Sequence, residues 1–187
     1  MVNNIYNNRK IIENRKTKPL FKLMGNVSLT DIYPYQALIS NWNISDTLTL
    51  REKNGIDFDT DKLKFYNHSS IQVASIANPT TSDYNQTLPM YKGLVDTINK
   101  ILKNTYRMRW AKLEKNQTLE YHLDPPTGDR FILVTEGEHI VEIDKKGDIV
   151  RQKMLPGEVW YINSSWYHKV INETEHDRLA ILGCFDL

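Results

Sequence analysis

The tripeptide His122-Leu123-Asp124 places an imidazole and a carboxylate two residues apart. If this piece of the chain is extended, both side chains leave the same face of a sheet and can reach one ion. His168, 46 residues downstream, would supply a second imidazole. The three residues together predict a metal site whose ligands come from two separate strands.

Two imidazoles and one carboxylate on one face of an octahedral ion leave three positions open. This ligand set is typical of non-haem Fe(II) oxygenases, which bind a co-substrate and O2 on the same ion. A structural zinc site is instead closed by four protein ligands, and the only cysteine of the chain is Cys184. The residues therefore favour an open Fe(II) site.

Arg178 follows His168 by ten residues and stands at the start of the last predicted strand. A guanidinium grips a carboxylate through two parallel hydrogen bonds, so Arg178 could hold the far carboxylate of 2-oxoglutarate while the keto acid end binds iron. The alternative is a surface salt bridge with Glu175 or Asp177.

The pattern of residue types along the chain, which predicts the elements that would position these residues, changes near residue 104. Residues 1–104 form an irregular N-terminal part, in which apolar residues recur at three- and four-residue steps from Met90 to Leu102 and predict a helix near 90–103. Residues 105–187 contain short β-branched and aromatic runs separated by turn residues, as in a jelly roll. The predicted strands are Tyr106–Leu113, Leu119–His122, Arg130–Val134, His139–Ile143, Ile149–Lys153, Val159–Ile162, His168–Asn172 and Leu179–Phe185.

The second part of the chain, roughly Trp110 to Phe185, resembles the aspartyl/asparaginyl β-hydroxylase family of 2-oxoglutarate oxygenases, which also includes free-proline hydroxylases. The resemblance implies a double-stranded β-helix, a mainly β fold. It also implies that His122, Asp124 and His168 bind Fe(II) and that Arg178 binds 2-oxoglutarate. The matching segments are Tyr121-His122-Leu123-Asp124-Pro125-Pro126, Asp129-Arg130-Phe131-Ile132, Pro156-Gly157-Glu158-Val159-Trp160, His168-Lys169-Val170-Ile171-Asn172 and Arg178-Leu179.

Four further positions follow from the same resemblance. Arg130 falls where the family has Arg-x-His and would assist the co-substrate. Asn172 matches a common family asparagine that either positions a ligand or caps the strand end. Ile132 stands where many relatives have a histidine, so that polar contact is missing or supplied from elsewhere. Ala180 stands where some related oxygenases have a serine.

Composition limits the other possibilities. Lys and Arg number 24 against 23 Asp and Glu, with no block of like charge long enough to bind a nucleic-acid backbone. The basic run from Arg9 to Lys22 is interpreted as a solvated tail rather than a polyanion-binding arm. No stretch of about 18 apolar residues predicts a membrane span, and the polar start of the chain and its single cysteine predict a cytoplasmic protein.

The predicted function is the hydroxylation of an amino-acid side chain, in a protein or in a free amino acid, with release of succinate and CO2. One alternative is a cupin-type metal enzyme, a dioxygenase or an isomerase, that does not use 2-oxoglutarate. The other is a jelly-roll binding protein without catalysis. These residues do not determine the substrate, because the same fold supports many different reactions. His68, His139 and His176 lack a partner at useful spacing and are treated as background.

Overall fold

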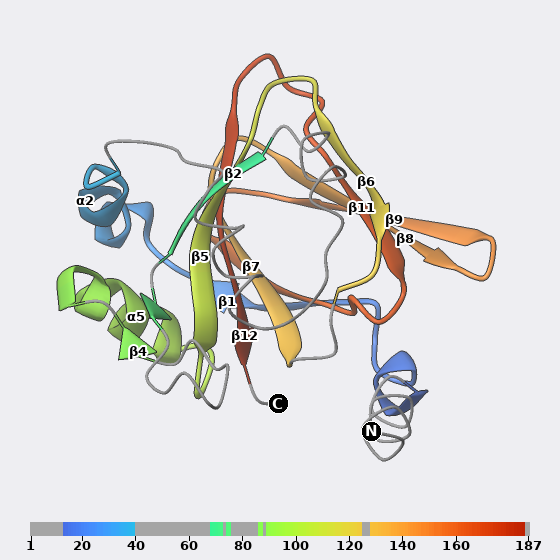
Figure 1. Ribbon diagram of the computed structural model, residues 1–187, viewed down its shortest axis with the longest axis horizontal. Helices are drawn as coiled ribbons and strands as arrows, with labels where there is room; N and C mark the ends of the chain where they lie inside the picture. Colours follow the sequence, from blue (N-terminus) through green and yellow to red (C-terminus); the bar gives the residue numbers. More distant parts are fainter. Residues whose placement is uncertain are drawn as a thin grey trace.

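The computed structural model describes residues 13–39, 68–72, 74–75, 86–87, 89–124 and 128–185. These residues build two antiparallel sheets that lie against each other as a jelly roll (Figure 1), so the predicted fold class is confirmed. One sheet has six strands in the order β1-β10-β7-β12-β5-β2, and the other has four in the order β6-β11-β8-β9. Pro125 and Pro126 of the matched motif lie outside the described residues.

The eight strands predicted in the second part of the chain all form, with bounds that differ from the prediction by at most two residues. Strand formation follows the short runs of β-branched and aromatic residues and the turn residues between them. The strands are β5 (Tyr106–Leu113), β6 (Thr118–His122), β7 (Asp129–Glu136), β8 (His139–Lys145), β9 (Asp148–Met154), β10 (Glu158–Ile162), β11 (Tyr167–Ile171) and β12 (Arg178–Phe185).

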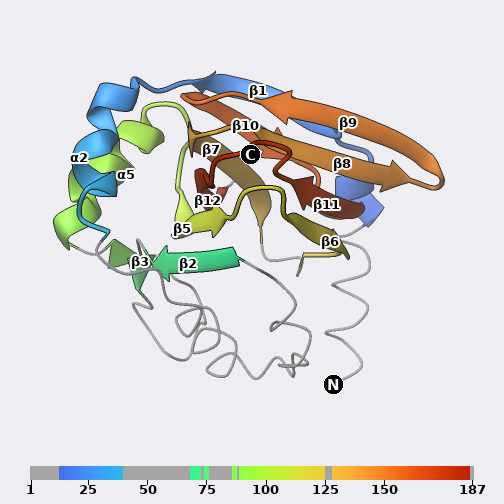
Figure 2. The same cartoon turned by 90° about the horizontal axis from the view of Figure 1, so that it is seen from above.

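The β8–β9 connection is a tight hairpin that extends at the end of the molecule opposite the helices (Figure 2). Lys146 and Gly147 both have positive φ angles, 60° and 95°. Such a pair is what a two-residue turn with the twist of the flanking strands requires. The backbone N–H of Gly147 donates to Asp144 Oδ1 (2.6 Å), which fixes the turn.

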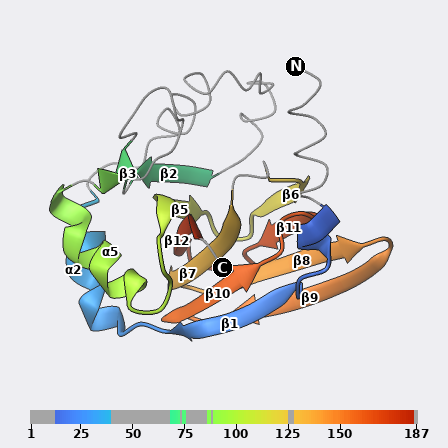
Figure 3. The ribbon, with the colours of Figure 1, turned by 90° about the horizontal axis from the view of Figure 1, so that it is seen from below.

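The first part of the chain adds strands that the sequence did not predict. β1 (Phe21–Asn26) pairs with β10, and β2 (His68–Gln72) pairs with β5, so these two strands form the edges of the six-stranded sheet. Figure 3 shows β1 running along β10. β3 (Ala74–Ser75) and β4 (Gln86–Thr87) form a separate two-stranded pair.

Helix α5 (Lys92–Asn99) confirms the helix predicted near 90–103, and a 3-10 turn, η2 (Pro89–Tyr91), precedes it. Its apolar face is buried in a core cluster that also includes Trp110 and Phe131 of the six-stranded sheet. The 3-10 turn η1 (Leu29–Asp31) and the short helix α2 (Tyr33–Gln36) lie at the same end of the molecule as α5 (Figure 1). Within the described ranges, no helix has both the length and the apolar character that crossing a bilayer requires.

A second core cluster includes residues of both sheets, among them Leu113, Ile132, Val141 and Val170. It contains Ala180, which is fully buried. The predicted site residues lie beside this second cluster. The six-stranded sheet, backed by the helices through the first cluster, is thus the rigid wall of the site.

Candidate metal centre

His122 and His168 face each other across a strand pair. β6 and β11 are antiparallel neighbours, and their register sets His122 directly opposite His168. The two imidazole rings lie 4.3 Å apart between centroids. Asp124 follows the end of β6 by two residues, as expected for a side chain on the same face. The pairing of two strands therefore brings together residues that are far apart in the sequence.

One potential ligand atom from each of His122, Asp124 and His168, here called the metal triad, lies within 4.8 Å of the others. Among the described residues this is the group of histidine, cysteine and acidic side chains that could hold an ion. His168 Nε2 lies 3.9 Å from Asp124 Oδ2. A single ion between these atoms is compatible with the arrangement that the sequence predicts.

The backbone fixes both imidazoles for metal binding. Nδ1 of His122 donates to the carbonyl oxygen of Glu120 (2.7 Å), and Nδ1 of His168 donates to that of Trp166 (3.1 Å). A carbonyl oxygen can only accept, so each proton sits on Nδ1 and each Nε2 keeps its lone pair. Such hydrogen bonds are the usual outer support of metal-ligating histidines.

The protonation states also suit a metal. Burial lowers the pKa of His168 to about 4, although the negative charge of Asp124 raises it in part. The ring is therefore neutral at pH 7. Burial alone would raise the pKa of Asp124, but the charge of Arg130, with smaller contributions from other nearby cations, holds it well below its usual range. Neutral imidazoles and an ionised carboxylate are the forms that bind metals, so the triad fits an ion.

Arg130 lies against the metal triad. Its Nε is 3.0 Å from Asp124 Oδ2, and one of its Nη atoms donates to Cys184 Sγ (3.3 Å). The predicted role was assistance to the co-substrate. In the structure its closest ionic partner is the carboxylate of Asp124, which it orients, although Arg130 also lines the cavity described next.

An inner cavity between the two sheets connects the metal triad with Arg178. The four-stranded sheet contributes His122, His168 and His139. The six-stranded sheet contributes three arginines from three adjacent strands: Arg109 on β5, Arg178 on β12 and Arg130 on β7. One face of the cavity thus carries metal ligands, and the opposite face carries positive charge.

Arg178 is 4% exposed. It is therefore buried, which excludes the alternative that it forms a surface salt bridge. Asp177, its candidate surface partner, instead bonds to Lys112 (3.2 Å). Burial lowers the pKa of Arg178 to about 9, so the guanidinium stays charged at neutral pH. Within the described part of the chain, no carboxylate forms a salt bridge with it, and its Nε has no hydrogen-bond partner.

His139 is the contact of Arg178 that the sequence did not reveal. An Nη of Arg178 donates to His139 Nδ1 (2.5 Å), so the proton of this neutral ring sits on Nε2, which is buried without a partner. Ile132 also lines the cavity, at the position where the resemblance noted in the sequence implies a histidine. His139 therefore supplies from β8 a polar group in the cavity that Ile132 cannot provide.

Asn172 has the contacts of a structural residue. Its Nδ2 donates to the carbonyl oxygens of Leu113, Glu114 and His176, and its Oδ1 accepts from Thr174. The side chain thus ties the β11–β12 loop to the end of β5. The structure favours the structural alternative for Asn172, and the residue is absent from the lining of the inner cavity.

The buried histidines make the metal-free protein sensitive to acid. Burial, reinforced by the charge of Arg178, holds the pKa of His139 well below 6.5, and that of His168 is also lowered. The unfolded chain binds protons below pH 6.5 that the folded chain does not, so stability is full above this pH and falls below it. We expect a loss of up to about 1.4 kcal/mol per pH unit for each histidine.

Urea unfolding between pH 5 and pH 8 in the presence of a chelator measures this dependence. His139→Gln keeps a side-chain acceptor for Arg178 but cannot titrate, so its stability should fall less steeply with acid than that of the wild type. Identical slopes for the two proteins would show that His139 does not stay neutral in the folded state.

Comparisons with known proteins find limited similarity. No family model and no curated protein matches the sequence. The chain is similar to oxalate decarboxylase of Bacillus subtilis, with a TM-score of 0.42 and 14% identity over 64% of this chain and 25% of that chain. It is also similar to Peruvianin-I, a cysteine peptidase from Thevetia peruviana latex, with a TM-score of 0.42 and 12% identity over 63% of this chain and 61% of that one. This chain spans about a quarter of the decarboxylase, and neither partial similarity says anything of the reaction.

Proposed function

We propose that this protein is an Fe(II)- and 2-oxoglutarate-dependent oxygenase that hydroxylates an amino-acid side chain. The observation that carries the proposal is the buried guanidinium of Arg178, which shares a cavity with the metal triad and has no carboxylate partner among the described residues. The sequence resemblance to the aspartyl/asparaginyl β-hydroxylase family supports the same assignment.

A buried charge without a counter-ion destabilises a fold, so the buried guanidinium of Arg178 is a reason to expect that an anionic ligand binds beside it. Transferring a charge out of water without a counter-ion destabilises a fold by several kcal/mol. In this cavity Arg178 Nε and His139 Nε2 are two buried donors without acceptors. A carboxylate at this end of the cavity would accept from both donors and neutralise the guanidinium.

The charges of the site select a dianion. The cavity lining includes Arg178, which has no carboxylate partner among the described residues, and Arg130, which pairs with Asp124, and a divalent ion on the triad would add two further positive charges. 2-Oxoglutarate has two carboxylates, one for Arg178 and one for the ion. The inner cavity measures about 70 Å³.

The protein's part in the reaction is positioning. His122, Asp124 and His168 would hold the ion and leave coordination positions open, Arg130 would orient Asp124, and Arg178 with His139 would anchor the far carboxylate. When bound, Fe(II) with O2 and 2-oxoglutarate supplies the oxidation of a C–H bond to C–OH, and 2-oxoglutarate is converted to succinate and CO2. The apolar residues of the second core cluster keep bulk water out of the cavity.

Succinate formation tests this proposal. We expect protein reconstituted anaerobically with Fe(II) and then exposed to air to convert 2-oxoglutarate slowly to succinate, faster when an accepted substrate is added, and not at all with a chelator present. Mass spectrometry of the succinate measures the turnover. Uptake of one iron per chain without succinate, across free amino acids and peptides, would instead indicate a metal enzyme that uses no 2-oxoglutarate or a binding protein.

A further inference from the structure

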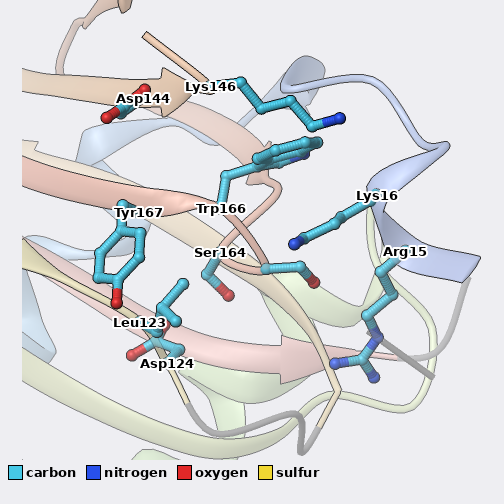
Figure 4. Close-up of a pocket in the computed structure, with 10 residues that line it drawn as sticks. Arg15, Lys16, Leu123, Asp124, Asp144, Lys146, Ser164, Trp166 and Tyr167 are labelled. Carbon is cyan, nitrogen blue, oxygen red and sulfur yellow. The ribbon is translucent and has the colours of Figure 1, made fainter. Parts of the chain in front are cut away.

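A second hollow, the outer pocket, also borders Asp124 (Figure 4). It has a volume of about 240 Å³. Leu123 and Asp124 lie on one side of it, and Arg15 and Lys16 extend into it from the N-terminal segment on the other (Figure 4). Asp124 lines both the outer pocket and the inner cavity. A molecule in the outer pocket would therefore lie next to the metal triad at Asp124.

The segment that carries Arg15 and Lys16 is fixed in place, although the sequence predicts a solvated tail here. Asn163, which is buried, donates through Nδ2 to the carbonyl oxygens of Arg15 (2.7 Å) and Lys18 (3.3 Å). Lys18 Nζ forms a salt bridge with the buried Asp129 at 2.7 Å. These contacts hold Arg15 and Lys16 in the wall of the pocket.

The outer pocket has an excess of positive charge. Lys18 Nζ forms the short salt bridge with Asp129 Oδ2. Arg15 Nε lies 4.0 Å from Asp129 Oδ1, so Arg15 is the more distant of the two cations that share this carboxylate. Lys16 Nζ sits 4.7 Å from the centre of the Trp166 ring, which holds the ammonium at the pocket by a cation–π contact. Lys146 adds a third cation to the lining.

The acidic residues of the lining do not cancel this charge. Asp124 already pairs with Arg130 and belongs to the metal triad. Asp144 accepts the backbone N–H of Gly147 and keeps its charge, so it offsets only one of the three cations of the lining. Ser164 and Ser165 add hydroxyl donors to the lining. The pocket thus offers cationic and hydroxyl donors to an anion.

We propose that the outer pocket binds the carboxylate of a free, amino-acid-sized substrate, with Arg15 and Lys16 as the carboxylate-binding residues. This inference rests on the proposed function and names its substrate class. The volume of about 240 Å³ lies below the roughly 300–1,000 Å³ of pockets that take drug-sized ligands, which suits a free amino acid better than a protein segment. The substrate's C–H bond would face Asp124 and the ion, while its carboxylate points to the N-terminal wall.

Calorimetry with the Fe(II)-loaded protein under anaerobic conditions tests the inference, with and without 2-oxoglutarate. The probes are the twenty common L-amino acids, their C-terminal amides and capped tripeptides with the same central side chains. We expect at least one free amino acid to bind, and its amide to bind at least tenfold more weakly. Arg15→Gln and Lys16→Gln should each weaken binding of the acid about tenfold and leave binding of the amide unchanged.

Lys100→Gln is the matched control. Lys100 is exposed at the end of α5, away from the pocket, so this variant should bind like the wild type. Equal binding of acids and amides, unchanged affinity in both pocket variants, binding of capped tripeptides alone, or no binding of any free amino acid would each overturn the inference. Binding that depends on Arg15 without any 2-oxoglutarate binding would uphold the carboxylate pocket and defeat the proposed function.

Discussion

His168→Ala is expected to abolish succinate formation and to lower the affinity for Fe(II) by more than about 100-fold. Loss of a group that merely supports a metal ligand typically lowers metal affinity 10–100-fold, and His168 would itself be one of three ligands. The residue is 2% exposed, and its Nδ1 is already bonded to the backbone, so Nε2 has no other evident purpose in the described structure. Competition with a chromophoric Fe(II) chelator under anaerobic conditions measures the affinity.

His176→Ala is the matched control for this experiment. His176 is exposed on the β11–β12 loop, and its backbone carbonyl, rather than its ring, accepts the bond from Asn172. The same substitution there should leave iron binding and turnover unchanged. Circular dichroism of both variants checks folding. A folded His168→Ala protein that still binds one Fe(II) per chain with wild-type affinity would remove His168 from the metal centre.

Arg178→Met is expected to weaken binding of 2-oxoglutarate by about 30- to 4,000-fold while Fe(II) affinity is retained. Removing one partner of a buried charged pair usually costs 2–5 kcal/mol, and each 1.4 kcal/mol is tenfold in affinity. The same substitution should stabilise the ligand-free protein, because it replaces an unpaired buried cation with an apolar side chain of similar length. Calorimetric titration and thermal unfolding measure the two effects.

Arg151→Met distinguishes this double effect from a general consequence of losing an arginine. Arg151 is 45% exposed and forms surface salt bridges with Glu142 and Glu173. Its replacement should leave 2-oxoglutarate affinity unchanged and alter stability by less than about 1 kcal/mol. An Arg178→Met protein that binds 2-oxoglutarate as the wild type does would assign the guanidinium a purely structural role.

The fold of residues 105–187 could be predicted because each strand carries its own local signal. Short runs rich in β-branched and aromatic residues end at turn residues such as Gly147 and Gly157, both with positive φ. β1 and β2 lack such a signal. β1 contains no β-branched residue, and its partner β10 lies more than 130 residues away in the sequence. Edge strands of this kind are specified by tertiary pairing rather than by local pattern.

The metal triad could be predicted because His122 and Asp124 are close in sequence and have a recognisable chemical role. His139 could not, since its role depends on contact with Arg178, 39 residues later and on the opposite sheet. Arg15 and Lys16 resemble a charged tail in sequence. Only the bonds of Asn163 to the backbone of this segment place them at a pocket.

Titration of the Fe(II)-loaded protein with 2-oxoglutarate in the absence of oxygen tests the central claim most directly. If the metal triad holds Fe(II) and Arg178 anchors the co-substrate beside it, chelation of the ion by the keto acid end will produce a metal-to-ligand charge-transfer band. The band should saturate at one equivalent and require a much higher concentration in Arg178→Met. A protein that binds Fe(II) but never develops this band would contradict the assignment as a 2-oxoglutarate oxygenase.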